Sequence, residues 1–159
     1  MTMLAAASDA LLAVAREQGL TVAVAESLTG GLLSSELVGP PGASDVVLGA
    51  VVAYATEVKA TVLGVDAELL AERGPVDGEV AAQMALGVAR LLSARCGVAT
   101  TGVAGPGPQD GKPAGRVHVA ASRDDVVRTR QLDLPGHREA VRERAALAAL
   151  ELLHEIVTG

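Results

Sequence analysis

The chain has 159 residues, enough for one domain over 1–159 with a buried core, and half of them are hydrophobic although Tyr54 is the only aromatic residue. A net charge of −6 argues against sequence-independent binding to nucleic acid as the main role. The single cysteine, Cys96, excludes an internal disulfide and suits a reducing compartment. We therefore expect a cytoplasmic protein with a small-molecule or protein partner and no nucleic acid.

No apolar run approaches the roughly 20 residues that cross a bilayer, so we expect no membrane partner. The first fifteen residues are apolar, but no basic segment precedes them and Asp9 interrupts them, which favours an amphipathic helix over a secretory signal. Small size and high apolar content favour a homo-oligomer, with a dimer as the first expectation.

Strands alternate with helices along the chain until a hairpin and a last helix close it. In chain order we expect a helix over 3–18, a strand over 21–25, a helix over 28–38, a buried strand over 46–54, a helix from Thr56 to Gly64, a short helix after Asp66, a helix over 77–95, a strand over 97–101, hairpin strands over 116–122 and 126–134, and a helix over 137–157. This order predicts a three-layer α/β/α sandwich with a mixed, mostly parallel sheet.

The segment AESLTGG joins the first strand to a helix, so Ser27 follows a strand and lies near a helix N-terminus. Ligands of open α/β sheets gather at the carboxyl ends of strands, and free N–H groups there favour anions. Glycines at 30 and 31 let backbone approach a ligand. Alternatively, Ser27 or Thr29 is simply an N-cap.

Lys59 also follows a strand, and it is one of only two lysines beside eleven arginines. If the two strands are neighbours, Lys59 and Ser27 emerge at the same edge of the sheet. A serine hydroxyl needs a base, and with no histidine in either segment Lys59 is the available one, provided that its pKa falls from about 10.4 to ~7–8. Alternatively, Lys59 is a surface lysine beside Glu57.

Two further segments carry polar chemistry. The glycine-rich loop TGVAGPG follows the third strand and can cradle a phosphate or sugar, although a lone glycine-rich turn is a weak signal. Arg138 and Arg142 share one face of the last helix, where a phosphate suits a pair of arginines. Pairing with Glu139 and Glu143 is the alternative. The three histidines have no metal-ligand spacing, so we expect no metal.

Taken together, these segments resemble the CinA C-terminal domain family, whose active members are nicotinamide-nucleotide amidohydrolases. The resemblance rests on the motifs AESLTGG, GAVVAYATEVKATVLGV, GPVD, TGVAGPGP, KPAGRVHVA and PGHREAVR, in family order from about Leu12 to Leu152. It implies hydrolysis of the carboxamide of nicotinamide mononucleotide to nicotinate mononucleotide and ammonia, without a cofactor. The alternatives are a catalytically silent nucleotide-binding relative and a structural or partner-binding module.

The resemblance also implies roles for individual residues. Ser27 would be the nucleophile and Lys59 the base, assisted by Tyr54, whose ring could contact the pyridinium. The substrate-binding residues that it implies are Glu26, Thr29, Gly30, Gly31, Thr101, Gly102, Gly105, Arg138 and Arg142. The N–H groups of residues 29–31 would form an oxyanion hole, and the two arginines would lie near the phosphate. This sequence departs from the family pattern at Leu28, Thr56 and Asp77.

Overall fold

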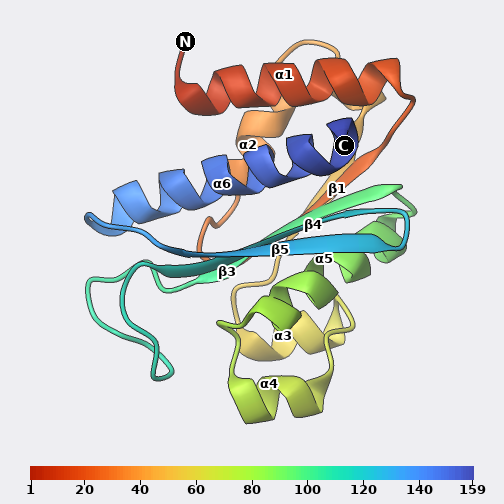
Figure 1. The fold of residues 1–159 in the computed structure, drawn as a ribbon. Helices are drawn as coiled ribbons and strands as arrows, with labels where there is room; N and C mark the ends of the chain where they lie inside the picture. The colour runs from red at the N-terminus through yellow and green to blue at the C-terminus, as the bar shows by residue number, and fades with distance from the viewer.

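The computed structural model describes residues 1–159, and its five strands form one mixed sheet in the order β2-β1-β3-β4-β5 (Figure 1). The strands are β1 (Val22–Glu26), β2 (Val47–Val52), β3 (Cys96–Gly102), β4 (Arg116–Arg123) and β5 (Val126–Asp133). Strand β1 pairs in parallel with both β2 and β3, whereas β4 is antiparallel to β3 and to β5. The predicted hairpin and the mixed sheet with a parallel core are confirmed.

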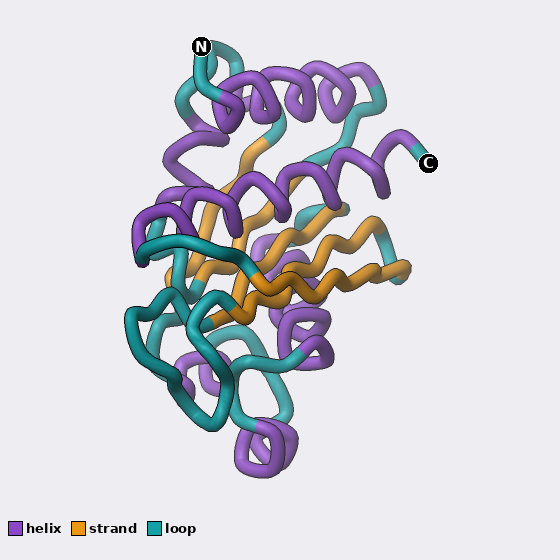
Figure 2. Tube along the Cα trace, turned by 60° about the vertical axis from the view of Figure 1, so that its left-hand side comes forward, coloured by secondary structure: helices purple, strands orange, loops and turns teal.

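Helices cover both faces of this sheet, which confirms the three-layer α/β/α sandwich (Figures 1 and 2). On one face lie α1 (Met3–Glu17), α2 (Leu32–Val38) and α6 (Arg138–Thr158), and on the other lie α3 (Thr56–Thr61), α4 (Ala67–Arg73) and α5 (Gly78–Leu92). A short 3-10 helix, η1 (Ala43–Asp45), precedes β2. None of these helices is long and apolar enough to cross a membrane.

Because the chain has almost no rings, Ala, Val and Leu make up nearly all of its buried core. One cluster lies between the sheet and the layer of α1, α2 and α6, and a smaller one lies under α5. Close packing depends on glycine at Gly97, where a Cβ atom would lie 2.0 Å from the Ala85 carbonyl oxygen of α5. Aliphatic packing of this kind brings α5 directly onto the strands that carry the site.

Strand β2 was predicted to be buried on both faces, and the structure shows that it is not. It is the outer strand of the sheet, and alternate side chains along it are exposed. Leu48 and Val52 are each 47% exposed. An apolar run predicts a strand but does not fix its position in the sheet, so its exposure could not be read from the sequence.

One helix near the site also begins differently from expectation. Helix α2 begins at Leu32 and not at residue 28, because residues 28–31 form turns that end on Gly31, whose φ of 105° lies in the left-handed region that favours glycine. Thr56 is the first residue of α3 and makes no capping hydrogen bond. Asp77 caps α5, its carboxylate accepting from the N–H groups of Glu79 and Val80.

Candidate functional site

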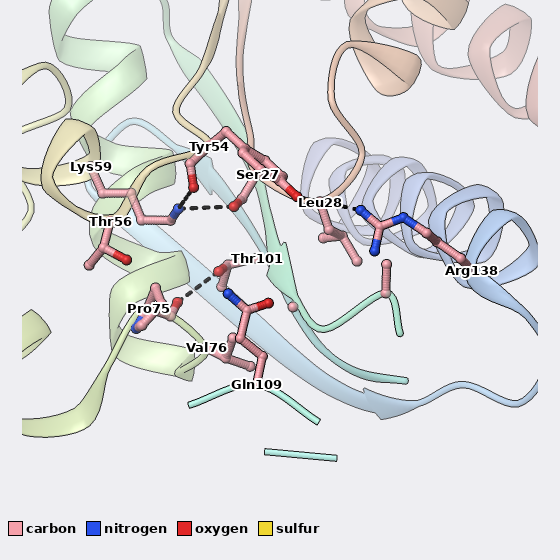
Figure 3. A pocket seen from close by; sticks show the side chains of 12 residues that line it. Ser27, Leu28, Tyr54, Thr56, Lys59, Pro75, Val76, Thr101, Gln109 and Arg138 are labelled. Carbon is pink, nitrogen blue, oxygen red and sulfur yellow. Dashed lines mark hydrogen bonds between the residues drawn. The ribbon is translucent and has the colours of Figure 1, made fainter. Parts of the chain in front are cut away.

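Ser27 and Lys59 meet at one edge of the sheet, as shown in Figure 3. Ser27 directly follows β1, and Lys59 lies in the first turns of α3, shortly after β2. Since β1 and β2 are parallel neighbours, both chains leave the sheet at the same edge. The Lys59 Nζ atom lies 2.9 Å from the Ser27 Oγ atom, a hydrogen-bonding distance between two residues 32 positions apart.

The Lys59 side chain is almost completely buried, with 1% of its surface exposed. Its Nζ donates to the carbonyl oxygens of Ala53 at 2.7 Å and Tyr54 at 3.3 Å, and no carboxylate forms an ion pair with it. Burial disfavours the charged ammonium and lowers the pKa of Lys59 from 10.5 to about 8. A substantial fraction of Lys59 is therefore neutral in mildly alkaline solution.

The three contacts of Nζ suit both protonation states of the side chain. The ammonium donates its three N–H groups to the Ala53 and Tyr54 carbonyls and to Ser27 Oγ, whereas the neutral amine donates to the two carbonyls and turns its lone pair toward Ser27. Carbonyl oxygens cannot donate, so the hydroxyl of Ser27 is the one proton donor among the three partners. The geometry therefore suits removal of the Ser27 proton by Lys59.

The turn after Ser27 leaves particular backbone donors free. The N–H of Ser27 donates to the Thr100 carbonyl at 3.1 Å, and that of Gly30 donates to the Ser27 carbonyl at 3.1 Å. Gly30 N–H is thus occupied, contrary to its expected place in an oxyanion hole. The N–H groups of Leu28, Thr29 and Gly31 donate to no group in the chain. A second anchor of this turn is the contact at 2.8 Å between the buried hydroxyls of Thr29 and Thr100.

Glu26 differs from its expected role as a substrate-binding residue. Its side chain is fully buried, and its carboxylate accepts from the N–H groups of Leu33 at 2.9 Å and Ser34 at 3.0 Å and from the Ser34 hydroxyl at 2.7 Å. The carboxylate thus occupies the N-terminus of α2, where the sequence suggested that a ligand anion could bind. Glu26 fixes the helix that follows the nucleophile and does not line the pocket.

Arg138 and Tyr54 lie together at the mouth of the site (Figure 3). The Arg138 guanidinium donates to the Gly105 carbonyl at 2.7 Å and to the Tyr54 hydroxyl at 3.4 Å. The Tyr54 side chain is 65% exposed, and its hydroxyl does not contact Lys59; only its backbone carbonyl does. Tyr54 therefore offers an open ring to a ligand, and it supports Lys59 through the backbone.

Arg142 is placed differently from Arg138, although one turn of α6 separates them. Its Nε donates to the Leu28 carbonyl at 2.9 Å, Nη2 donates to the Thr29 carbonyl at 3.2 Å, and Nη1 contacts Glu139. Gly30 lies against it, since a Cβ there would be 3.4 Å from Nη2. Arg142, the side chain of Thr29 and the turn glycines 30 and 31 do not line the pocket that holds Ser27.

The pocket itself brings together segments from across the chain. Its lining comprises Ser27, Leu28, Tyr54, Thr56, Lys59, Pro75, Val76, Thr101, Gly102, Ala104, Gln109 and Arg138. Of the residues expected in the glycine-rich segment, Thr101 and Gly102 lie in this lining, and Gly105 lies beside it through Arg138. The Thr101 hydroxyl donates to the Pro75 carbonyl at 2.7 Å and is therefore engaged within the chain.

Several of these residues were not predicted as site residues. Thr100 and Ala53 act through buried contacts, and Pro75 and Val76 approach from the segment before α5. Gln109 reaches the pocket from the glycine-rich loop. The GPVD motif and Thr100, the first of two adjacent threonines, were signals available in the sequence, but neither indicates its partner without the fold.

Other chemistry-bearing side chains lie elsewhere. No group of three or more His, Cys, Asp or Glu side chains gathers as metal ligands would. Cys96 is fully buried, and burial raises the pKa of its thiol to about 11, so it is a poor nucleophile. His118 lies next to Thr101 across β3 and β4, and burial lowers its pKa. The Ser27–Lys59 pair is therefore the reactive centre that the structure offers.

Comparison with known proteins agrees with this architecture. The family model of the CinA C-terminal domain matches residues 4–157 of this chain. The chain belongs to the CinA C-terminal domain family. It is 49% identical over 143 residues to a CinA-like protein of Frankia casuarinae, and 44% identical over 143 residues to one of Mycolicibacterium gilvum. These alignments cover 90% and 89% of this chain but 33% and 34% of the relatives, so the chain spans about a third of their length.

Solved structures of the CinA superfamily extend this similarity to the fold. The competence/damage inducible protein CihA of Agrobacterium tumefaciens has a TM-score of 0.94 and 33% identity, with 100% of this chain and 98% of that chain covered. A CinA superfamily protein of Klebsiella pneumoniae has a TM-score of 0.93 and 30% identity, with 98% of both chains covered. The sheet order and helical layers described above are thus those of CinA-type domains.

Proposed function

We propose that this CinA-type domain hydrolyses the carboxamide of nicotinamide mononucleotide, giving nicotinate mononucleotide and ammonia, with Ser27 as nucleophile and Lys59 as base. The observation that carries the proposal is the 2.9 Å contact between Ser27 Oγ and a buried lysine that no carboxylate neutralises. A serine next to a structural, ion-paired lysine would gain no reactivity. Here the burial that depresses the lysine pKa makes the amine a usable base.

In the first half of the reaction, the Ser27 hydroxyl passes its proton to the neutral Nζ of Lys59 while Oγ bonds to the carboxamide carbon. The resulting tetrahedral intermediate carries negative charge on the former carbonyl oxygen, which backbone N–H groups can stabilise. The carbon–nitrogen bond then breaks, and the leaving nitrogen takes the proton from Lys59 and departs as ammonia. An ester between Ser27 and the nicotinoyl group remains, and Lys59 is neutral again.

In the second half, Lys59 removes a proton from water, and the resulting hydroxide attacks the ester carbon. The bond between that carbon and Ser27 Oγ breaks, and Oγ takes the proton back from Lys59. The product is nicotinate mononucleotide, and both side chains return to their starting states. Every proton in the cycle passes through the atoms that lie 2.9 Å apart in the free protein.

The remaining pocket residues suit the rest of such a substrate. The exposed Tyr54 ring can lie against a cationic pyridinium. Arg138 lies in the pocket lining and can bind a phosphate, and the side chain of Gln109 can hydrogen-bond a ribose or amide. Family membership supports the assignment only at the level of the domain, because the relatives' names specify no reaction.

Incubation of the purified protein with nicotinamide mononucleotide, with ammonia and nicotinate mononucleotide both measured, tests the proposal. Wild type should form the two products in equal amounts, and Ser27→Ala should lower the rate about 10³-fold or more because no other nucleophile is present. Serine is small, so the variant should retain its circular dichroism spectrum. Binding of the nucleotide by calorimetry without any product would instead identify a catalytically silent relative.

A further inference from the structure

The turn between β1 and α2 contains two successive peptide groups whose carbonyl oxygens are held. The Ser27 carbonyl accepts from the N–H of Gly30 at 3.1 Å. The next carbonyl, that of Leu28, accepts from Nε of Arg142 at 2.9 Å, across 114 positions of sequence. The orientation of the first peptide is therefore set by the turn itself, and that of the second by a side chain from α6.

Holding a carbonyl also orients the N–H on the other side of the same peptide. In a planar trans peptide the C=O and N–H bonds point in opposite directions. The N–H groups of Leu28 and Thr29 therefore point away from Gly30 and from Arg142, respectively. Leu28 is 4% exposed and Thr29 fully buried, yet neither N–H donates to any group in the chain. Leu28 lines the pocket beside Ser27, so its unpaired N–H and that of Thr29 next to it are free to donate to a ligand oxygen.

We infer that Arg142 is a positioning residue that aims the second of these N–H groups, that of Thr29, at the substrate oxygen, an inference that rests on the proposed hydrolysis. Leu28 follows the nucleophile directly, and in serine hydrolases of the α/β type the N–H at that position stabilises the oxyanion. Thr29 supplies the second donor. Arg142 contacts neither the substrate nor the reacting atoms; it acts through the Leu28–Thr29 peptide.

The hydrogen bonds that the Arg142 guanidinium makes distinguish this positioning role from phosphate binding. Nε and Nη2 donate to two successive carbonyls, those of Leu28 and Thr29, and Nη1 contacts the Glu139 carboxylate at 3.1 Å. The rigid planar fork of an arginine holds two carbonyls in a fixed relative geometry, which the flexible side chain of a lysine does not reproduce. All three nitrogens thus have acceptors in the chain, whereas Arg138 lies in the pocket lining.

The test compares Arg142→Gln and Arg142→Lys with Arg144→Gln, which removes the same charge two residues along the same helix. Each protein is assayed on nicotinamide mononucleotide and on the corresponding riboside, which lacks the phosphate. Arg142→Gln should lower kcat about 10²-fold on both substrates, the size of effect expected when an oxyanion donor is lost, while KM changes less than threefold. Arg142→Lys should retain about tenfold more activity than Arg142→Gln, and Arg144→Gln should match wild type.

A rise in KM for the nucleotide alone, with kcat unchanged and the riboside unaffected, would show that Arg142 binds phosphate and would overturn the inference. Unchanged kinetics in both Arg142 variants would also overturn it. If wild type hydrolyses neither substrate, the proposed function fails separately. Crystal structures of wild type and Arg142→Gln then test the positioning: a rotated Leu28–Thr29 peptide in the variant supports it, and an unmoved peptide contradicts it.

Discussion

Two of the segments that line the pocket are held in very different ways. The turn after β1, residues 27–31, is held by several long-range contacts: the Glu26 carboxylate just before it bonds to α2, the Thr29 hydroxyl contacts that of Thr100, and Arg142 donates to the Leu28 carbonyl. The glycine-rich loop over 103–115 is mostly exposed between Pro106 and Ala114, and its tip is joined chiefly by a backbone pair between Gln109 and Lys112.

This difference suggests a division of labour within one pocket. The densely bonded turn carries the atoms that react, where preorganised geometry raises kcat. Under the proposed function, the exposed loop contacts the more distant parts of the substrate, where interactions that are equally strong in the ground state and the transition state affect KM. Substitutions in the two regions should therefore separate into effects on kcat and effects on KM, and the following predictions test that separation.

The largest effect is expected at the base. Lys59→Met keeps the length and apolar character of the buried side chain but removes the amine, so kcat should fall about 10³-fold, within the range for loss of a general base. Lys112→Met, a change at the only other lysine, should leave kcat within twofold of wild type. Comparable losses in the two variants would show that the effect does not arise at the Ser27–Lys59 contact.

The second effect is the pH dependence that the proposed hydrolysis should show in the wild-type protein. Lys59 must be neutral to act, and its pKa is lowered to about 8. Below that value kcat/KM should fall tenfold per pH unit, so that it is about 100-fold lower at pH 6 than on the alkaline plateau. A profile that is flat between pH 6 and pH 9 would contradict a base of this pKa.

Strand–helix junctions were the part of the site best predicted from the sequence. Ser27 and Lys59 each follow an apolar run, and parallel neighbours must deliver such residues to the same edge of a sheet. The contacts that orient them were not predictable in the same way. Arg142 reaches Leu28 across 114 positions, and the partners of Glu26 depend on where α2 begins.

The fold shows the same limit. Periodicity predicted every strand and the helical layers, because alternation and apolar spacing are local properties. It did not predict that β2 is an outer strand, since strand order depends on which strands pair, and pairing joins residues far apart in sequence. Local pattern thus predicted the elements, whereas long-range contacts determined which groups remain free to act.

The third effect concerns stability. The folded pKa of Lys59, about 8, lies below its ordinary value of 10.5, so the unfolded chain binds more protons between these values and the native state gains stability as pH rises. The unfolding free energy of wild type relative to Lys59→Met should therefore increase by about 2–3 kcal/mol between about pH 7 and pH 10. Urea denaturation at several pH values measures this difference. A difference that does not change with pH would contradict a Lys59 pKa that burial lowers in the folded state.

The smallest effect is expected in the exposed loop. Gln109→Ala removes one side-chain hydrogen-bonding group from the pocket lining, so KM should rise up to about tenfold, the value of one hydrogen bond, with kcat within twofold of wild type. Steady-state kinetics on nicotinamide mononucleotide measure both constants. A loss confined to kcat would show that the loop also positions the reacting groups, and the division between the two regions would fail.

The most direct test of the account is a titration of Lys59 by ¹³C NMR of protein labelled at the lysine Cε position. The chain has only two lysines, so two signals are expected, and the one missing from Lys59→Met belongs to Lys59. The account predicts that this signal titrates near the value of about 8 set by burial. A Lys59 signal that shifts only near pH 10 would show that the side chain stays protonated until then, and it would contradict the assignment of Lys59 as the base that activates Ser27.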